Sequence, residues 1–226
     1  MIWSAARPGA FPGTRGSLPI GPGDLLQPAF EFGQLLRDPV FWGWGVRRGD
    51  GHTVLVLPGL GAGDAYLRPL RGWLRRLGYR TMRSGIRRNP GLSERLLTEL
   101  GERVEAEYRR TGRRLSIIGH SMGGAQARAI ARRHPQAVRQ VITLGSPIAG
   151  SPPLPRTIRV GAIASADDRI VRAPAAVARD PHADNLSVHG SHSGLAVNAT
   201  VYRRLARLLA AAEDPARDAA PAPEYL

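Results

Sequence analysis

Short apolar runs alternate along this chain with longer segments in which apolar residues recur at helical spacing. Residues 53–57 (TVLVL) form an apolar, β-branched run, which is typical of a strand buried on both faces. Further strands are expected at residues 79–82, 114–118, 138–144, 157–164 and 185–188. The patterns between them predict helices at residues 64–77, 89–112 and 121–134 and from 194 onward.

Residues at the predicted helix ends support these bounds. Asp64 can cap the helix at 64–77, and Gly78 fits the turn that closes it. Asn89 and Pro90 suit the cap and first position of the next helix, whose apolar stripe continues to Gly112.

This alternation predicts an α/β fold: a mostly parallel central sheet of about six strands with helices on both faces. A chain of 226 residues suits one catalytic domain, expected at residues 24–212. Residues 1–23, rich in Pro and Gly, predict an irregular arm, and residues 213–226 a polar tail. The aromatic segment 24–46 predicts a short helix and a packed connector, either covering a sheet edge or walling an acyl-binding pocket.

Composition excludes several kinds of chemistry. The chain has no cysteine, which rules out disulfides, thiolate catalysis and cysteine metal sites. Its net charge of +14 comes from arginine alone, and these arginines are dispersed without interleaved aromatics. We therefore expect a solvated basic surface rather than binding to nucleic acid or anionic membranes. Without a signal-like start or a long apolar run, we expect no transmembrane segment and a cytoplasmic location.

One motif carries catalytic chemistry. Residues 115–124 (LSIIGHSMGG) contain Gly-x-Ser-x-Gly at a predicted turn from strand to helix. Exposing the hydroxyl of Ser121 requires a sharply turned backbone, and Gly119 and Gly123 let the neighbouring backbone pass closely. The helix that begins there directs N–H groups and its positive dipole end toward negative charge forming beside Ser121. The spacing predicts a nucleophilic serine rather than a simple glycine-rich connector.

Here the sequence resembles the α/β-hydrolase superfamily, and more closely its small lipase-like and esterase-like serine hydrolases. The resemblance covers roughly residues 53–209. It is carried by the strand and turn at 54–61, GHSMGG at 119–124, LGSP at 144–147, DDRIV at 167–171 and GSHSG at 190–194. The family order of nucleophile, acid and histidine is obeyed. The resemblance implies a compact hydrolase, and only residues 146–156 are available for a cap, too few for a helical one.

A serine nucleophile needs a base to take its proton, and the base needs a partner that fixes its tautomer. His192 lies in a Gly/Ser-rich loop before the terminal helix and is the predicted base, with His189 as the alternative. Three other histidines are interpreted as ordinary, two of them as surface residues and one as a helix C-terminal residue: His52, His182 and His134.

The acid is predicted at the C-terminal end of the strand at 157–164, where functional loops of open α/β sheets gather. The family pattern acid-x-apolar-Val points to Asp168, with Asp167 as the main alternative and Asp180 and Asp184 as lesser candidates.

The resemblance also implies two backbone donors for the oxyanion, Met122 after the nucleophile and Leu60 in the turn after the first strand. That turn has Pro58-Gly59 where many relatives have His-Gly. Four residues are candidate apolar walls of a substrate pocket: Leu60, Met122, Ile148 and Leu195.

These features predict hydrolysis of a small-molecule or lipid-like carboxylic ester through an acyl-enzyme on Ser121. No metal-ligand cluster, phosphate loop or dinucleotide fingerprint occurs, so no cofactor is implied. Two alternatives stay open: acyl transfer to an acceptor other than water, and a non-catalytic binding module on the hydrolase scaffold. The acyl chain length and the oligomeric state are also open.

Overall fold

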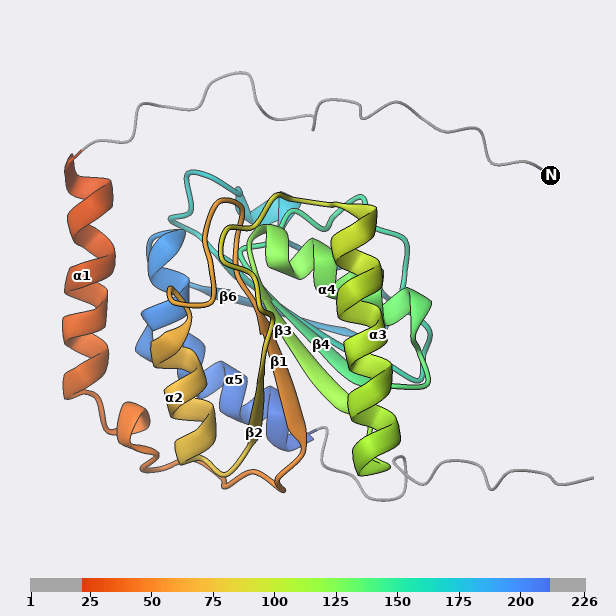
Figure 1. Ribbon diagram of the computed structural model, residues 1–226. Helices are drawn as coiled ribbons and strands as arrows, with labels where there is room; N and C mark the ends of the chain where they lie inside the picture. The colour runs from red at the N-terminus through yellow and green to blue at the C-terminus, as the bar shows by residue number, and fades with distance from the viewer. Residues whose placement is uncertain (1–21, 212–226) are drawn as a thin grey trace, which may run out of the picture.

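The computed structural model describes residues 22–211 and is built around one parallel sheet (Figure 1). Its strand order is β2-β1-β3-β4-β5-β6, and every neighbouring pair is parallel. The strands are β1 Thr53–Leu57, β2 Arg80–Arg83, β3 Leu115–His120, β4 Val138–Leu144, β5 Arg159–Ser165 and β6 Ala183–Val188. The prediction of a mostly parallel α/β sheet of about six strands is confirmed, and the bounds of β1 and β4 agree with those expected.

Helices cover both faces of the sheet (Figure 1). The α-helices are α1 Pro22–Arg37, α2 Arg68–Arg76, α3 Glu94–Thr111, α4 Met122–Arg133 and α5 Ala199–Ala211, and the 3-10 helices are η1 Pro39–Trp42, η2 Ala173–Ala175 and η3 Ser193–Val197. Side chains alternate along each strand. On β1, Val54 and Val56 pack with α2 and α5, whereas Leu55 and Leu57 pack with α3 and α4. The sheet therefore separates two apolar clusters.

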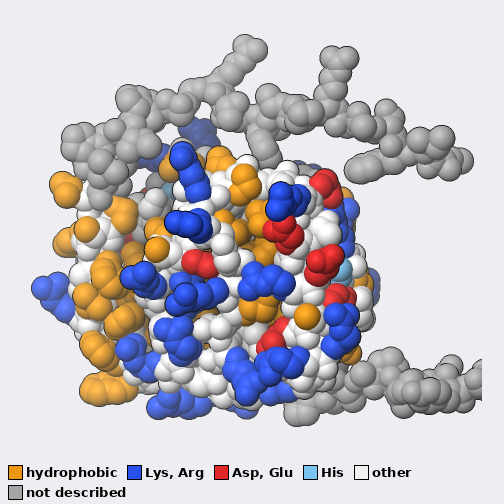
Figure 2. Space-filling model, in the orientation of Figure 1, with side chains coloured by type: hydrophobic (Ala, Val, Ile, Leu, Met, Phe, Trp, Pro, Cys, Tyr) orange, Lys and Arg blue, Asp and Glu red, His pale blue; other side chains and the backbone are white. Residues whose placement is uncertain are grey.

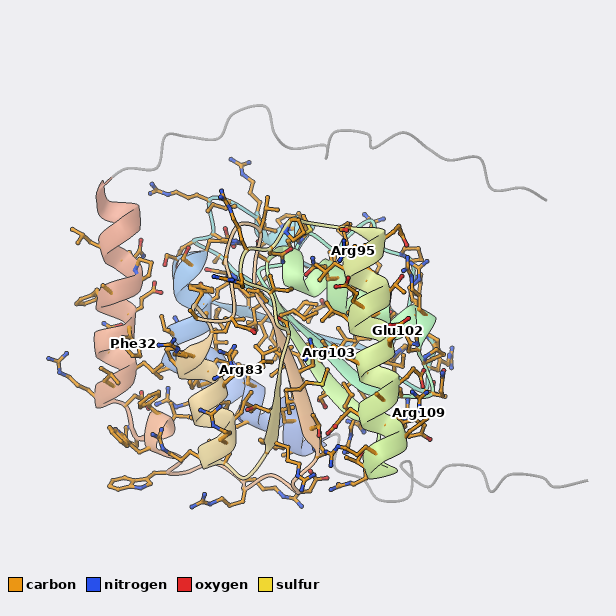
Figure 3. All side chains as sticks on the ribbon, viewed as in Figure 1. Phe32, Arg83, Arg95, Glu102, Arg103 and Arg109 are labelled. Carbon is orange, nitrogen blue, oxygen red and sulfur yellow. The ribbon has the colours of Figure 1, made fainter. Side chains whose placement is uncertain are left out.

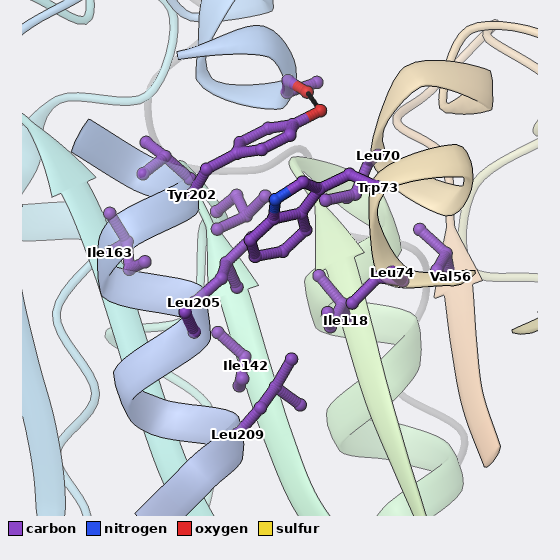
Figure 4. Close-up of a cluster of buried hydrophobic side chains, with 14 of the residues drawn as sticks. Val56, Leu70, Trp73, Leu74, Ile118, Ile142, Ile163, Tyr202, Leu205 and Leu209 are labelled. Carbon is purple, nitrogen blue, oxygen red and sulfur yellow. Dashed lines mark hydrogen bonds between the residues drawn. The ribbon is translucent and has the colours of Figure 1, made fainter. Parts of the chain in front are cut away.

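Two large aromatic side chains lie at the centre of the cluster between the sheet, α2 and α5 (Figure 4). Trp73 and Tyr202 have no exposed surface, and their ring centroids are 4.6 Å apart. Each polar atom is paired, because the indole N–H of Trp73 donates to the carbonyl of Val40 at 2.8 Å and the Tyr202 hydroxyl donates to that of Ala196 at 3.1 Å. These bonds fix η1 and η3 to the core.

The N-terminal segment adds an outer layer beyond α2 and α5 (Figure 1). Leu35 is fully buried, and Phe32 packs against the same apolar cluster. A helix and a packed connector are present as predicted, although α1 is 16 residues long rather than short, and its main contacts are with η1, η3 and α5. Of the predicted arm at 1–23, only residues 22 and 23 are described, and they begin α1; the predicted tail lies outside the described residues.

Two predicted helix starts are wrong. Asp64 does not cap α2, which begins at Arg68; its carboxylate instead accepts hydrogen bonds from Ser84 and Gly85 and pairs with Arg71. Long-range partners therefore replace the local cap.

Asn89 likewise precedes α3 without capping it. Its side chain is 2% exposed and donates to the carbonyl of Pro58 at 2.7 Å and to Gln126 at 3.0 Å. The true cap is Ser93, which accepts from the N–H of Leu96. The side chain of Asn89 thus holds the turn that follows β1.

The expected terminal helix is broken in two. The short η3 ends before Asn198, whose side chain accepts from the N–H groups of Thr200 and Val201 and so starts α5. The predicted helix ends are confirmed at Gly78 and Gly112, which both adopt positive φ, +100° and +66°.

The arginines of α3 illustrate the solvated surface (Figure 3). Arg95 and Arg109 lie along its exposed side, and Arg95 pairs with Glu99 at 2.7 Å. Arg103 instead reaches back to donate to the carbonyl of Arg83 at 2.6 Å.

Candidate active site

Ser121 occupies a strained turn between β3 and α4. Its φ of 51° and ψ of −123° make it the one non-glycine residue with positive φ among the described residues. A Cβ atom on Gly119 would lie 2.3 Å from the carbonyl carbon of Gly123, and one on Gly123 would lie 2.4 Å from the carbonyl oxygen of Leu57. No side chain fits in either place, so both glycines are required for this turn.

His192 and Asp168 form a buried pair near this turn. His192 Nδ1 lies 2.6 Å from Asp168 Oδ2, and the residues are 8% and 5% exposed. The other carboxylate oxygen of Asp168 accepts the N–H groups of Ile170 and Val171, both at 2.8 Å. A carboxylate held in this way keeps a proton on Nδ1 and leaves the lone pair of Nε2 available to accept one.

The main alternatives for base and acid are paired with each other in solvent. His189 Nδ1 lies 3.1 Å from Asp167 Oδ2, and these side chains are 85% and 49% exposed. A hydrogen bond from the N–H of Gly190, with His189 beside it, lowers the pKa of Asp167. The chain thus has two adjacent Asp–His pairs, and the buried one is Asp168–His192.

The lesser candidates for the acid have other surroundings. Asp180 forms a buried ion pair with Arg128 at 2.8 Å and accepts the N–H of Leu154 at 2.6 Å, which ties the segment after β4 to α4. Asp184 is exposed on β6. His52, predicted at the surface, is 1% exposed and its Nε2 lies 3.0 Å from the hydroxyl of Ser116, so that prediction is wrong.

Gly145, directly after β4, connects the nucleophile turn with the Asp–His pair. The N–H of Ser121 donates to the carbonyl of Leu144 at 2.8 Å. A Cβ on Gly145 would lie 3.1 Å from Asp168 Oδ2 and 3.3 Å from His192 Nδ1. Among the described residues no hydrogen bond yet joins the Ser121 hydroxyl to His192. Such bonds are often long in free enzymes and shorten when substrate binds.

His120 lies beneath the site. It is 4% exposed, its Nε2 donates to the carbonyl of His192 at 2.9 Å, and the two imidazole centroids are 5.0 Å apart. Burial, reinforced by the neighbouring His192, lowers the pKa of His120 to about 4. The ring is therefore neutral near pH 7 and adds no second positive charge beside His192.

Glu31 on α1 supports the loop that carries His192, and no sequence motif signalled it. Its carboxylate is 6% exposed and accepts the N–H of Ser191 at 2.7 Å and the hydroxyl of Ser191 at 3.2 Å. A Cβ on Gly194 would lie 1.2 Å from a carboxylate oxygen of Glu31, so only glycine fits there. Tyr66 holds the same loop by donating to the carbonyl of Ser193.

The turn after β1 lies beside the nucleophile. A Cβ on Gly59 would lie 3.1 Å from that of Ser121, and the N–H of Gly61 donates to the carbonyl of Asn89 at 2.9 Å. Met122 begins α4, so its N–H has no acceptor within the helix. Of the two predicted backbone donors, Met122 directly follows Ser121, and Leu60 follows Gly59, which lies beside Ser121.

The predicted pocket walls separate into two kinds. Leu60 is 63% exposed and Met122 is 9% exposed. Ile148 and Leu195 are 1% and 0% exposed and pack in the two apolar clusters, so they present no wall to a substrate. Both residues are apolar and lie close to a motif in sequence. Core residues have the same two features, so the sequence pattern does not distinguish them from pocket walls.

Comparisons with known proteins agree with this architecture. Residues 94–196 match the PGAP1-like alpha/beta domain family. Comparison with curated protein sequences gives no match.

Several solved structures share the fold. The monoacylglycerol lipase of Paleococcus ferrophilus superposes with a TM-score of 0.57 at 11% identity, over 74% of this chain and 97% of that one. A lipase-esterase related protein of Clostridium acetobutylicum gives 0.55 at 15% identity, over 72% and 97%. MGS-MChE2, an alpha/beta hydrolase enzyme from a lagoon sediment metagenome, gives 0.53 at 14% identity, over 71% and 90%. The chain has the α/β-hydrolase fold.

Proposed function

We propose that this protein is a serine hydrolase that cleaves carboxylic esters, with Ser121 as nucleophile, His192 as base and Asp168 as the residue that orients the base. The observation that carries the proposal is the buried 2.6 Å contact between His192 Nδ1 and Asp168 Oδ2, next to a serine in strained backbone. Strain at a non-glycine residue is characteristic of functional sites.

In the first half of the reaction, His192 Nε2 takes the proton of the Ser121 hydroxyl as its oxygen attacks the ester carbonyl carbon. The tetrahedral intermediate then collapses, the bond to the alkoxy oxygen breaks, and that oxygen leaves with the proton from His192. In the second half, water attacks the acyl-enzyme and gives its proton to His192. The carboxylic acid then leaves and Ser121 regains its proton.

The developing oxyanion needs donors aimed at it, which are often the largest catalytic contribution. The N–H of Met122 suits this role because it is unused within α4 and lies at the positive end of that helix. The N–H of Leu60 is the second proposed donor, in a turn held by Asn89.

The short connection between β4 and β5 and the fold support the proposed substrate class. Residues 145–158, between β4 and β5, are rich in proline. Among the described residues, this connection contains no helix and therefore no inserted helical cap. Structures sharing the fold include a lipase and a lipase-esterase related protein, which supports a small or lipid-like ester as substrate.

The test is intact-mass spectrometry after incubation with a fluorophosphonate, on wild-type protein and on Ser121→Ala. We expect one adduct on the wild type and none on the variant, followed by turnover in a chain-length series of p-nitrophenyl esters. Absence of an adduct on folded wild-type protein would overturn the proposal. An adduct with turnover only when an alcohol or amine acceptor is added would instead assign acyl transfer.

A further inference from the structure

Exposed apolar side chains concentrate on one flank of the molecule. Five of the nine large hydrophobic residues that are exposed in the described part lie within residues 26–44: Leu26, Phe30, Leu36, Trp42 and Trp44. Trp44 is 72% exposed and Phe30 is 66% exposed. Figure 2 shows apolar side chains gathered on the side where α1 lies. Clustered exposure of this kind marks an interaction surface.

Arginines from distant parts of the chain converge on the same flank. Arg76 stacks over the rings of Phe41 and Trp42, with its guanidinium carbon 4.9 and 5.0 Å from their centroids. Arg37 ends α1, and Arg203 of α5 pairs with Asp38 at 2.6 Å. A few of the arginines that are distant in sequence, Arg37, Arg76 and Arg203, therefore lie on the same flank as exposed aromatic residues.

A groove lies at the lower end of this flank, between the turn after η1 and α5. Its volume is about 330 Å³. Val40, Ala206 and Ala210 provide apolar lining and Trp44 one wall, while three arginines border it: Arg47, Arg203 and Arg207. An apolar lining with a cationic border suits a ligand that is itself apolar and anionic.

We propose that the α1–η1 face, defined as the exposed residues of 26–48 together with Arg76, Arg203 and Arg207, docks on an anionic lipid bilayer. Tryptophan favours the interface between headgroups and acyl chains. Arginines near an anionic surface contribute about 1 kcal/mol each. The proposed contact is interfacial, made by side chains of this face. No helix in the described range 22–211 is long and apolar enough to cross a bilayer.

Other occupants fit this face less well. A second copy placed by two-fold symmetry would bring like-charged arginines together, which disfavours association. Nucleic acid would use the arginines but would leave Leu26 and Phe30 in water. The proposal goes beyond ester hydrolysis, because none of its residues belongs to the site around Ser121.

The first test is cosedimentation with vesicles of phosphatidylcholine, alone or mixed with phosphatidylglycerol. We expect the wild type to sediment with the mixed vesicles at low salt and to remain in solution with phosphatidylcholine alone. The double variant Phe30→Ser, Trp44→Ser should bind the mixed vesicles about tenfold more weakly, because it loses apolar insertion. The matched control, Leu92→Ser with Val177→Ser, removes exposed apolar residues elsewhere and should bind like wild type.

Charge is tested separately with the double variant Arg37→Gln, Arg207→Gln. The control is the double variant Arg109→Gln, Arg132→Gln, which lowers the net charge equally at exposed positions elsewhere. The first pair should weaken binding several-fold more than the second. Equal losses in the two arginine pairs would overturn the proposal by showing that overall charge alone drives the contact. Equal losses in the two apolar double variants would overturn it by showing that the apolar residues of this face have no special part in binding.

Quenching by bromine-labelled lipid in the mixed vesicles locates the contact. In a Trp3→Phe background, quenching of tryptophan fluorescence should decrease in the double variant Trp42→Phe, Trp44→Phe, since the remaining Trp73 is buried and stays out of reach. Unchanged quenching would place another surface on the bilayer. Absence of wild-type binding to any of the vesicles would also overturn the proposal. If the wild type then proved to be a dimer that Phe30→Ser, Trp44→Ser dissociates, the face would be assigned to contact with a second copy.

Discussion

Glu31 of α1 accepts both the backbone N–H and the hydroxyl of Ser191, the residue that directly precedes His192. A helix outside the sheet thereby fixes the loop of the proposed base. We predict that Glu31→Ala lowers kcat about ten- to hundredfold, because small displacements of a catalytic group are costly. Glu31→Gln, which can still accept the N–H bond, should keep most of the activity. Ester turnover and circular dichroism of both variants check this, and equal activity of Glu31→Ala and wild type would contradict it.

The same carboxylate predicts a pH dependence of stability. Burial raises the pKa of Glu31 above its ordinary value of 4.5. The Glu31 carboxyl group therefore stays protonated to a higher pH in the folded state than in the unfolded state. As a result, the free energy of unfolding falls as pH rises from 4.5 to the raised pKa. Glu31→Gln cannot titrate and should lose this part of the slope. Urea unfolding of both proteins between pH 4 and 7 measures the difference, and parallel curves would refute the prediction.

The two adjacent Asp–His pairs allow a matched test of the acid. Asp168→Asn removes the charge that orients and stabilises the His192 imidazolium, and we predict a loss of kcat of about 10³- to 10⁴-fold. Asp167→Asn changes a side chain that is half exposed and contacts the exposed His189 and the N–H of Gly190, so its effect should stay within about threefold. If Asp167→Asn is the damaging substitution, the acid assignment is wrong.

Ser121 offers a test of stored strain. Its backbone lies at φ 51° and ψ −123°, a conformation that costs a non-glycine residue about 1–3 kcal/mol. We predict that the free energy of unfolding of Ser121→Gly is about 1 kcal/mol higher than that of Ser121→Ala, although both variants lack the nucleophile. Paired denaturant titrations decide this. An alanine variant at least as stable as the glycine variant would mean that the turn is not strained.

The positions of the central strands could be predicted from sequence because burial on both faces requires continuous apolar runs, whereas the edge strands β2 and β6 are partly exposed and their bounds differ from those predicted. β1 and β4 have no other reasonable interpretation, and the order Ser121, Asp168, His192 follows from motifs at the ends of β3, β5 and β6. Local patterns were sufficient there, since parallel strands bring their C-terminal ends to one edge.

The roles of residues that depend on partners far away in the chain could not be predicted from the sequence. Asp64 and Asn89 have side chains that suit helix caps, but loop and turn backbone elsewhere in the chain takes up their polar groups. Glu31 looks like an ordinary helix carboxylate until Ser191, 160 positions later, is brought to it. Ile148 and Leu195 show the same limit, since an apolar residue near a motif suits a core as well as a pocket.

His120 gives a prediction about acid stability that isolates one buried imidazole. Its pKa is lowered from 6.5 to about 4 by burial, so the unfolded chain gains a proton on this ring between those values while the folded chain does not. The contribution of the neutral His120 ring to the free energy of unfolding is complete above pH 6.5. It is lost as pH falls toward 4, by about 3 kcal/mol in all.

The substitution His120→Gln removes this titration and keeps an N–H that can donate to the carbonyl of His192. We therefore expect the wild type to lose about 2–3 kcal/mol more stability than His120→Gln between pH 7 and pH 4.5. Urea midpoints at the two pH values measure the difference, with His182→Gln, at an exposed position, as the control that should behave like wild type. An equal loss of stability in all three proteins would mean that His120 is protonated in the folded state.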